Sequence, residues 1–387
     1  METENLKCGP DLSENGIARL QPQGPISLQT ISQSPLLSAA QRAASGPTGV
    51  VLFDFANAQV IDGFGLAHLL SLTLQLKQKA LVVAACNLGN KSLALFHELG
   101  LDRFLQLYSD LTTARQKLKP NGPQPAQNIS AAEEISPAHE LLPVTMWPAA
   151  MGPTQLATDP DTSEPAPPRP LNLIDRRPQG PGAGFGSLWL KTYKVRLVSQ
   201  EVTLDAVAER LKKRLPEYWP EGNRITLPEG LTCGAPGIID LTLPGGLKLS
   251  TGIRVLNVSD LAFAFVPIQG HMEAGWISFG VTREDGYPTV VVQSLARTGD
   301  PFYELGFDIF GHRQQEEFWN QTLSALALDF GEKALIEISA SCLDSPKNWR
   351  GWSTIYWNAG LRTITSRALS RLQRLWPRQS DKPQNEL

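Results

Sequence analysis

The sequence has few cysteines, no long apolar run and no excess of positive charge. Its four cysteines lie far apart, and no two have the C-x-x-C spacing of a zinc site or a redox couple. No stretch of about 20 apolar residues occurs, and the polar N-terminus lacks a signal peptide's apolar segment. A formal net charge of -3 does not favour nucleic acid as a partner. These absences predict a cytoplasmic protein with no metal site and no cofactor.

The chain is long enough for two domains, since one domain usually takes roughly 100–200 residues. Residues 119–186 are rich in Pro, Gly, Ser and Gln. Prolines block both helices and sheet ladders, so this stretch predicts a flexible linker. We predict a first domain over 1–118, the linker over 119–186, a second domain over 187–331 and a C-terminal extension over 332–387.

The first domain has the pattern of a parallel sheet covered by helices. Residues 50–55 and 80–86 are continuous apolar runs, as expected for buried parallel strands. Leucines recur at helical spacing over 66–76, and a second helical pattern over 93–99 ends at Gly100. This order predicts an α/β sheet with helices on one face.

The second domain has an α+β pattern. Residues 189–198 alternate like a strand, 204–215 form an amphipathic helix, and a long helix is expected over 314–328. Between the helices, turn signals separate five predicted strands, at 238–243, 248–255, 262–267, 274–282 and 289–297. We predict a curved antiparallel sheet around the long C-terminal helix.

The segment VVLFDFANAQVIDGFGLAHLL at residues 50–70, together with the pattern that follows it to about residue 114, resembles a STAS domain, the small αβ module of bacterial anti-sigma-factor antagonists. An apolar strand ends on Asp, and an acidic D-x-x-G turn then opens a helix. The resemblance implies a regulatory protein partner: an anti-sigma factor, a kinase-like protein or another STAS protein. It places the partner-binding residues at this turn and on the first helical turn, namely Asp62, Gly63, Phe64, Gly65 and His68.

The same resemblance implies a phosphorylated serine directly after the aspartate of the turn. In this chain the position is Gly63, which has no hydroxyl to carry a phosphate. The usual switch is therefore absent at its usual place. Asp62 is expected to cap the following helix through its first N–H groups, with or without contacting a partner, and Gly65 to permit close approach of a partner.

The second half resembles a START-like (SRPBCC) helix-grip family, on residues that include GWISFGVTREDGYPTVVVQ at 275–293. The resemblance implies a cavity between the curved sheet and the last helix that holds an apolar small molecule or lipid. Any single aromatic side chain here is also explained as ordinary core. The candidate pocket residues are Phe263, Phe265, Trp276, Phe279, Tyr303, Phe307, Phe318 and Trp319.

Motifs for catalysis are missing from the sequence. There is no G-x-S-x-G, no H-E-x-x-H and no P-loop. His271 with Glu273, and His312 with Glu316, are compact pairs of titratable residues, but both are better interpreted as solvated turn residues. We therefore predict no catalytic residues.

The segment 359–376 has the pattern of a basic amphipathic helix. Arginines separate its apolar residues, and it contains no acidic residue. It is explained either as a terminal helix packed on the second domain or as a docking segment for an anionic membrane or an acidic partner. The residues of the second interpretation are Arg362, Arg367, Arg371, Arg374 and Trp376.

Together these patterns favour a non-enzymatic regulatory protein, in which a STAS domain binds a protein partner and the second domain binds an apolar ligand. One alternative is a lipid-handling carrier, cytoplasmic but peripheral at a membrane surface. A second alternative is a cyclase- or hydrolase-like enzyme that works in the helix-grip cavity.

Overall fold

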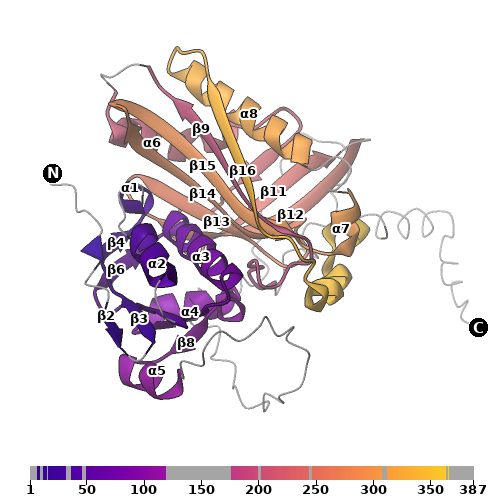
Figure 1. Cartoon of the computed structure of the whole chain (residues 1–387). Coiled ribbons are helices and arrows are strands. Elements are labelled where there is room, and N and C mark those ends of the chain that lie inside the picture. Colours follow the sequence, from indigo (N-terminus) through magenta and orange to yellow (C-terminus); the bar gives the residue numbers. More distant parts are fainter. Residues whose placement is uncertain are drawn as a thin grey trace, which may run out of the picture.

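Two domains pack side by side in the computed structural model of this chain (Figure 1). The structure describes residues 7–8, 12–14, 16–31, 36–45, 49–118, 176–198, 202–243, 246–306, 312–362 and 365. Among these residues, no helix is both long enough and apolar enough to cross a membrane.

The first domain is built on a five-stranded sheet in the order β2-β3-β5-β7-β8. Strands β3, β5, β7 and β8 are parallel, and β2 pairs with β3 antiparallel. The two predicted central strands are confirmed as β5 and β7. The bounds are β2 Leu12–Glu14, β3 Ile17–Leu20, β5 Val50–Asp54, β7 Val82–Cys86 and β8 Gln106–Tyr108. A smaller sheet joins β1 (Lys7–Cys8), β4 (Pro22–Ile26) and β6 (Ala58–Ile61).

Helices cover both faces of this five-stranded sheet, whereas the sequence predicted helices on one face. Alternate strand residues such as Val51 and Phe53 pack with residues of α2, α3 and α4. The other face, with Leu52, packs against Ala114 of α5. Coverage on both faces explains why every residue of β5 is buried. The helices are α1 Leu28–Ile31, α2 Leu36–Ser45, α3 Gly63–Gln78, α4 Asn90–Glu98, the 3₁₀ turn η1 Leu101–Arg103 and α5 Leu111–Lys117.

The second domain is an eight-stranded antiparallel sheet in the order β10-β11-β12-β13-β14-β15-β9-β16. The strands are β9 Leu188–Arg196, β10 Arg224–Thr226, β11 Pro236–Leu243, β12 Leu247–Val258, β13 Ala262–Pro267, β14 Glu273–Glu284, β15 Tyr287–Thr298 and β16 Ile336–Asp344. Its helical segments are α6 Leu204–Arg214, η3 Leu215–Tyr218, α7 Pro301–Gly306, α8 His312–Asp329 and η6 Trp349–Trp357.

Residues of α6 and α8 pack with one face of this sheet, which we call the α8 face; it includes Tyr193, Phe279 and Val292. The predicted strands over 189–297 and the long helix are confirmed, with α8 two residues longer at its start than expected. The START-like family assignment itself stays a prediction.

Two segments outside the predicted limits of the second domain belong to it. Residues 176–186 lie against the sheet, with Gln179 N–H donating to the Pro267 carbonyl at 2.7 Å and Phe185 N–H to the Thr298 carbonyl at 2.8 Å. The linker predicted over 119–186 is therefore too long at its end. Strand β16, which was placed in the C-terminal extension, pairs with β9 along the edge of the sheet.

The first domain packs on the opposite face of the same sheet, which we call the α3 face. Phe64 and Leu28 form an apolar cluster there with Ala262 and Val291. At the far end of α3, Gln78 Nε2 donates to the Leu343 carbonyl at 3.3 Å. Figure 1 shows the sheet between the first domain on one side and α8 on the other.

Candidate functional site

A large cavity lies between the α8 face of the second domain's sheet and helices α7 and α8. Its volume is about 710 Å³, within the range of roughly 300–1,000 Å³ that small-molecule sites occupy. The apolar part of its lining comes from the strands, α7, α8 and the segment after η3. These residues include Ile239, Leu241, Ile253, Phe265, Ile277, Phe279, Phe302, Leu305, Phe318, Trp319 and Trp219.

Most of the aromatic residues predicted for this pocket border the cavity. They are Phe265, Trp276, Phe279, Tyr303, Phe318 and Trp319. Phe263 is instead buried core, stacked on the ring of Phe279 with centroids 4.9 Å apart. The indole of Trp276 packs on the α3 face, because side chains alternate along β14. Phe307 lies outside the described residues.

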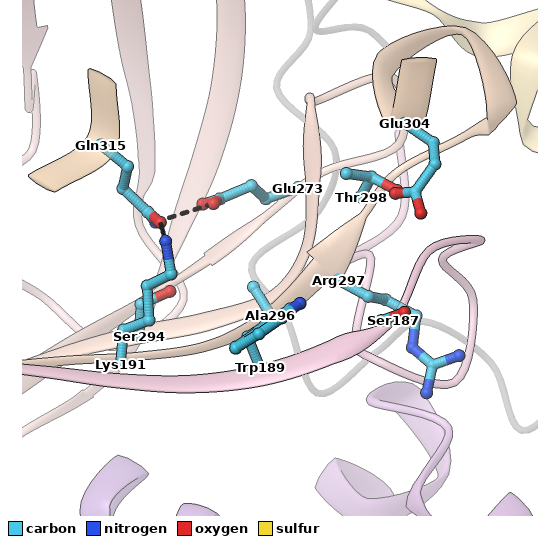
Figure 2. Close-up of a pocket in the computed structure, with 10 residues that line it drawn as sticks. All are labelled: Ser187, Trp189, Lys191, Glu273, Ser294, Ala296, Arg297, Thr298, Glu304 and Gln315. Carbon is cyan, nitrogen blue, oxygen red and sulfur yellow. Dashed lines mark hydrogen bonds between the residues drawn. The ribbon is translucent and has the colours of Figure 1, made fainter. Parts of the chain in front are cut away.

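A polar pocket of about 100 Å³ adjoins the cavity and shares Glu273, Ala296 and Gln315 with it. Figure 2 shows Gln315 reaching from α8 to two strands of the sheet. Lys191 Nζ donates to Gln315 Oε1 at 2.8 Å, and Gln315 Nε2 donates to Glu273 Oε1 at 2.8 Å. This chain of hydrogen bonds fixes a carboxyl group at the border of an apolar cavity.

On the other side of the polar pocket, the charged side chains also pair with groups of the protein itself. Arg297 Nη2 donates to Asp344 Oδ2 at 2.9 Å, and Thr298 Oγ1 donates to Glu304. Lys347 forms an ion pair with Glu304 at 3.3 Å. These charges are therefore already matched within the protein.

Two titratable groups of the cavity have shifted pKa values. Burial raises the pKa of Glu273 to about 6, although Lys191 and the hydrogen bond from Gln315 oppose the shift. Burial lowers the pKa of His271 to about 4, so its ring is neutral at pH 7. His271 Nδ1 accepts a hydrogen bond from the Glu273 N–H at 3.0 Å, which leaves the ring proton on Nε2.

The interpretation of His271 and Glu273 as solvated turn residues was wrong. His271 is 8% exposed, and both residues line the cavity. Glu273 is the first residue of β14, and the sheet and α8 together cover it. Groups with shifted pKa values in a cavity mark a candidate functional site.

The acidic turn of the first domain begins α3 as predicted. Asp62 Oδ1 accepts from the Gly65 N–H at 2.8 Å and is the N-cap of the helix. Burial raises the pKa of Asp62 to about 6, against the hydrogen bonds from Gly65 and Leu28 that lower it. A Cβ on Gly65 would lie 2.1 Å from the Ile26 carbonyl oxygen. Glycine is therefore needed at position 65 because the backbone of α3 approaches that of β4 closely within the first domain.

Gly63 lies against the second domain. Its N–H donates to Asn257 Oδ1 at 3.1 Å, and its carbonyl accepts from Trp276 Nε1 at 2.9 Å. A Cβ at this position would lie 2.3 Å from Ser278 Oγ and 3.0 Å from Ala264 Cβ. The contact between the domains therefore has no room for the serine that the resemblance implies.

The predicted partner-binding residues Asp62, Gly63, Phe64 and Gly65 are all buried, and His68 is partly buried. In this conformation the second domain of the same chain covers the turn. His68 lies one helical turn after Phe64 on the same side of α3.

The predicted docking residues of the C-terminal segment are mostly outside the described residues. Arg362 is described, and its guanidinium lies 5.8 Å from the ring centroid of Trp357. Arg367, Arg371, Arg374 and Trp376 are not described, so the predicted basic helix stays a prediction.

Sequence reasoning missed Lys191, Gln315 and the contact residues Asn257 and Ser278. A signal existed for Lys191, since strand alternation places it on the same face as Tyr193 and Val195. A lysine in the buried register of an amphipathic strand indicates a paired internal charge. No local signal marks Asn257 or Ser278, because their partner Gly63 lies about 200 residues away in the chain.

Residues 13–114 match the family model of the STAS domain. The match covers the sheet of the first domain, the acidic turn and α3. The turn that faces the second domain is therefore part of a STAS domain.

Solved structures similar to parts of the chain include the protein Ms6760 of Mycobacterium smegmatis, with 12% identity, 36% of this chain and 88% of that chain covered, and a TM-score of 0.28. An anti-sigma factor antagonist of Mycobacterium paratuberculosis has 18% identity, covers 29% of this chain and 91% of its own, and has a TM-score of 0.25. Major latex-like protein 151 of Panax ginseng has 14% identity, covers 37% of this chain and 98% of its own, and has a TM-score of 0.27. No curated protein matches the chain.

Proposed function

Because the chain contains a STAS domain and a second domain with a cavity of ligand size, we propose that it is a non-enzymatic regulatory protein. In this proposal the second domain binds an apolar small molecule, and the STAS domain transmits the bound state to a protein partner. The observation that carries the proposal is the cavity of about 710 Å³ with its largely apolar lining.

The polar groups around the cavity favour a neutral ligand. His271 is uncharged, Lys191 is paired through Gln315, and Arg297 is paired with Asp344. A charged ligand would leave one charge buried without a partner, which is costly. An apolar molecule with a hydroxyl, carbonyl or amide group suits Glu273 and Gln315, whereas a fatty acid anion does not.

Strand β14 supports a link between the ligand and the STAS domain. On its α8 face, Ile277 and Phe279 line the cavity. On its α3 face, Trp276 donates to the carbonyl of Gly63, and Ser278 lies under the same glycine. One strand therefore separates the cavity from the acidic turn, and a ligand that displaces it changes the contact with the STAS domain.

Several buried polar atoms at the contact between the two domains have no hydrogen-bond partner in the described part of the chain, which supports the proposal that this contact separates reversibly. Ser278 Oγ, Gln293 Oε1 and His68 Nε2 are buried and have no hydrogen-bond partner among the described residues. Ser278 and Gln293 are register neighbours on the α3 face, beside α3. Each unsatisfied group costs roughly 1–3 kcal/mol, which hydration would recover once the domains separate. Separation would also expose Asp62 and Phe64 to an outside protein.

The cavity is tested with the neutral fluorescent probe N-phenyl-1-naphthylamine on the full chain. We expect saturable binding with a stoichiometry of one. Ile277→Trp fills the cavity from its wall and should weaken binding by about tenfold or more, which is about 1.4 kcal/mol. The matched control is Ile338→Trp, because Ile338 is 42% exposed on the same sheet and does not line the cavity.

Native mass spectrometry of the purified chain, followed by extraction, identifies any molecule that copurifies. A neutral apolar compound at one per chain supports the proposal. Equal probe binding by the two tryptophan variants contradicts it, since the probe would then bind elsewhere.

A catalytic function is the second candidate, and the raised pKa of Glu273 beside the cavity favours it. A general base there would take a proton from a bound ligand and convert it to a product, which chromatography separates from the ligand even when the two have the same mass. Incubation of the copurified compound with the protein and with Glu273→Gln separates the two functions. A product formed by the natural chain and absent with Glu273→Gln would establish an enzyme, whereas an unchanged ligand supports the binding protein.

A further inference from the structure

An exposed aromatic surface lies on the 3₁₀ segment η6, outside the cavity. Trp349 and Tyr356 are each 71% exposed, and Trp352 is 53% exposed. In a 3₁₀ helix, residues three apart lie on the same side, so Trp349, Trp352 and Ile355 form a row. The ring of Tyr356 lies 6.3 Å from that of Trp352. We call Trp349, Trp352, Ile355 and Tyr356 the aromatic surface.

The other side of η6 is fastened to the second domain, so the outward direction of these rings is built into the fold. Thr354 Oγ1 donates to the Gly299 carbonyl at 2.7 Å. A Cβ on Gly351 would lie 2.4 Å from the Gly184 carbonyl oxygen, which shows how closely the backbones approach. A rigid segment that exposes two tryptophans and a tyrosine is a typical interaction surface.

The aromatic surface adjoins the rim of the cavity through α7. Asn358, directly after η6, donates to Asp300 Oδ2 at 2.8 Å, and Gly360 N–H donates to Tyr303 Oη at 3.0 Å. On α7, Phe302 and Leu305 border the cavity and are 45% and 66% exposed. Figure 1 shows the yellow segment after β16 beside α7. Apolar side chains thus extend from the cavity rim toward η6.

The sequence segment that carries this surface is basic, and two carboxylates that contact its flanks are already paired, Glu304 with Lys347 and Asp300 with Asn358. Residues 345–380 contain seven Lys or Arg and no Asp or Glu, in a chain whose net charge is -3. Within the described part, Arg350 is exposed on η6 and Arg362 is partly buried beside the ring of Trp357, whereas Arg176, over the same ring, is only 7% exposed. Tryptophan and tyrosine beside arginine suit the headgroup region of a bilayer with anionic lipids.

We propose that the aromatic surface, with the exposed Arg350 on the same segment, docks the protein on a membrane surface that contains anionic phospholipids. The protein lies on the membrane, and the cavity rim at α7 faces the lipid. An apolar ligand would then reach the cavity without crossing water. The docking itself depends on η6 alone and does not require the proposed ligand function.

The test is sedimentation of the full chain with vesicles of phosphatidylcholine alone and of phosphatidylcholine with about 30% phosphatidylglycerol. We expect about tenfold stronger binding to the anionic vesicles, and a large loss near 1 M NaCl, where the Debye length is about 3 Å. The double variant Trp352→Ser with Tyr356→Ser should lower binding to anionic vesicles by about tenfold or more.

The matched control is Leu328→Ser with Leu335→Ser, which removes two apolar side chains that are 72% and 78% exposed elsewhere. It should bind vesicles as the natural chain does. Far-UV circular dichroism and thermal unfolding check that both double variants are folded.

Three results would overturn the proposal. One is equal binding to neutral and anionic vesicles, and another is full binding by the Trp352 and Tyr356 double variant. The third is a dimer in sedimentation velocity that this variant dissociates, since the surface would then belong to a second copy of the chain. If the natural chain bound vesicles as expected but did not bind the probe in its cavity, the proposed ligand function would be refuted and the proposed docking would still stand.

Discussion

The two domains have cores of opposite kind, although each is a sheet covered by helices. In the STAS domain, the hollow lined by Phe53, Leu70 and Phe96 has a volume of about 10 Å³, too small to hold more than a water molecule. In the second domain, the hollow under α8 has a volume of about 710 Å³. The first core is filled by its own side chains, and the second leaves space for another molecule.

This difference indicates that the core of the STAS domain mainly provides stability, whereas the core of the second domain gives up some stability to keep a cavity. A filled core has many contacts to lose, so it specifies one structure. A core with a large cavity gives up such contacts along its walls, a loss that a bound molecule would offset. The contact at Gly63 joins the two kinds of core, since the STAS helix α3 packs directly behind β14.

The substitution with the largest expected effect lies in the filled core of the STAS domain. Leu70→Ala removes a side chain that is 2% exposed and should lower the free energy of unfolding by about 2–5 kcal/mol. Leu241→Ala makes the same change at the cavity wall, where the side chain is only partly buried, and should cost about 1 kcal/mol. Urea unfolding followed by circular dichroism measures both. Similar losses would show that the second core is filled in solution.

The second prediction concerns the buried carboxyl between the domains. The pKa of Asp62 is 3.8 in the unfolded chain and about 6 in the folded chain. Between pH 4 and 6 the folded state therefore holds a proton that the unfolded state has released. Asp62 should therefore lower the free energy of unfolding as pH rises through this window, by roughly 3 kcal/mol at most, while Glu273 and His271 make their own contributions in the same window. Asp62→Asn should lack this contribution alone, so the difference in the free energy of unfolding between the variant and the natural chain, measured by urea unfolding from pH 4 to 7, isolates it.

The control for this prediction is Asp110→Asn. Asp110 also caps a helix, but hydrogen bonds from Ser109 and Thr113 lower its pKa to about 2. A group with a lowered pKa stabilises the fold above its unfolded pKa and loses this contribution only in stronger acid. Asp110→Asn should therefore leave the slope between pH 4 and 6 unchanged. An identical slope for Asp62→Asn and the natural chain would contradict the buried carboxyl.

The third prediction separates the domains without touching either core. Gly63→Leu places a side chain on Ser278 Oγ and should cost about 1–3 kcal/mol and open the contact. Hydrogen exchange should become faster along Ala262–Pro267 and near Trp276, while β5 and β7 stay protected. Gly89→Leu is the control, because no atom lies within 4 Å of its added Cβ. Equal exchange in the two variants would show that the contact tolerates a side chain at Gly63.

Local patterns predicted most helices and strands. Strands β5 and β7 follow from continuous apolar runs, and α3 follows from leucines at helical spacing after an acidic turn. Strand β13 was predicted with its bounds unchanged, since turn residues flank it on both sides. These elements were accessible because their signals lie within a few residues of one another.

The missed features depend on distant partners. Strand β16 alternates weakly and forms by pairing with β9, which lies about 150 residues earlier. His271 and Glu273 looked like turn residues because the segments that cover them, such as α8 over Glu273, are distant in the chain. Burial depends on how the helices and the sheet pack together, so it cannot be predicted from a short stretch of sequence.

The sequence by itself determined that an α/β domain, which resembles a STAS domain, precedes a second, antiparallel domain, because periodicity and turn chemistry are local. It also determined that Gly63 has no phosphoacceptor hydroxyl, since that depends on residue type alone. The tertiary structure decided that Gly63 faces Ser278 and Trp276, and that Glu273 lies at the border of a cavity. Both depend on how the second domain's sheet is covered on its two faces, α8 on one and the STAS domain on the other.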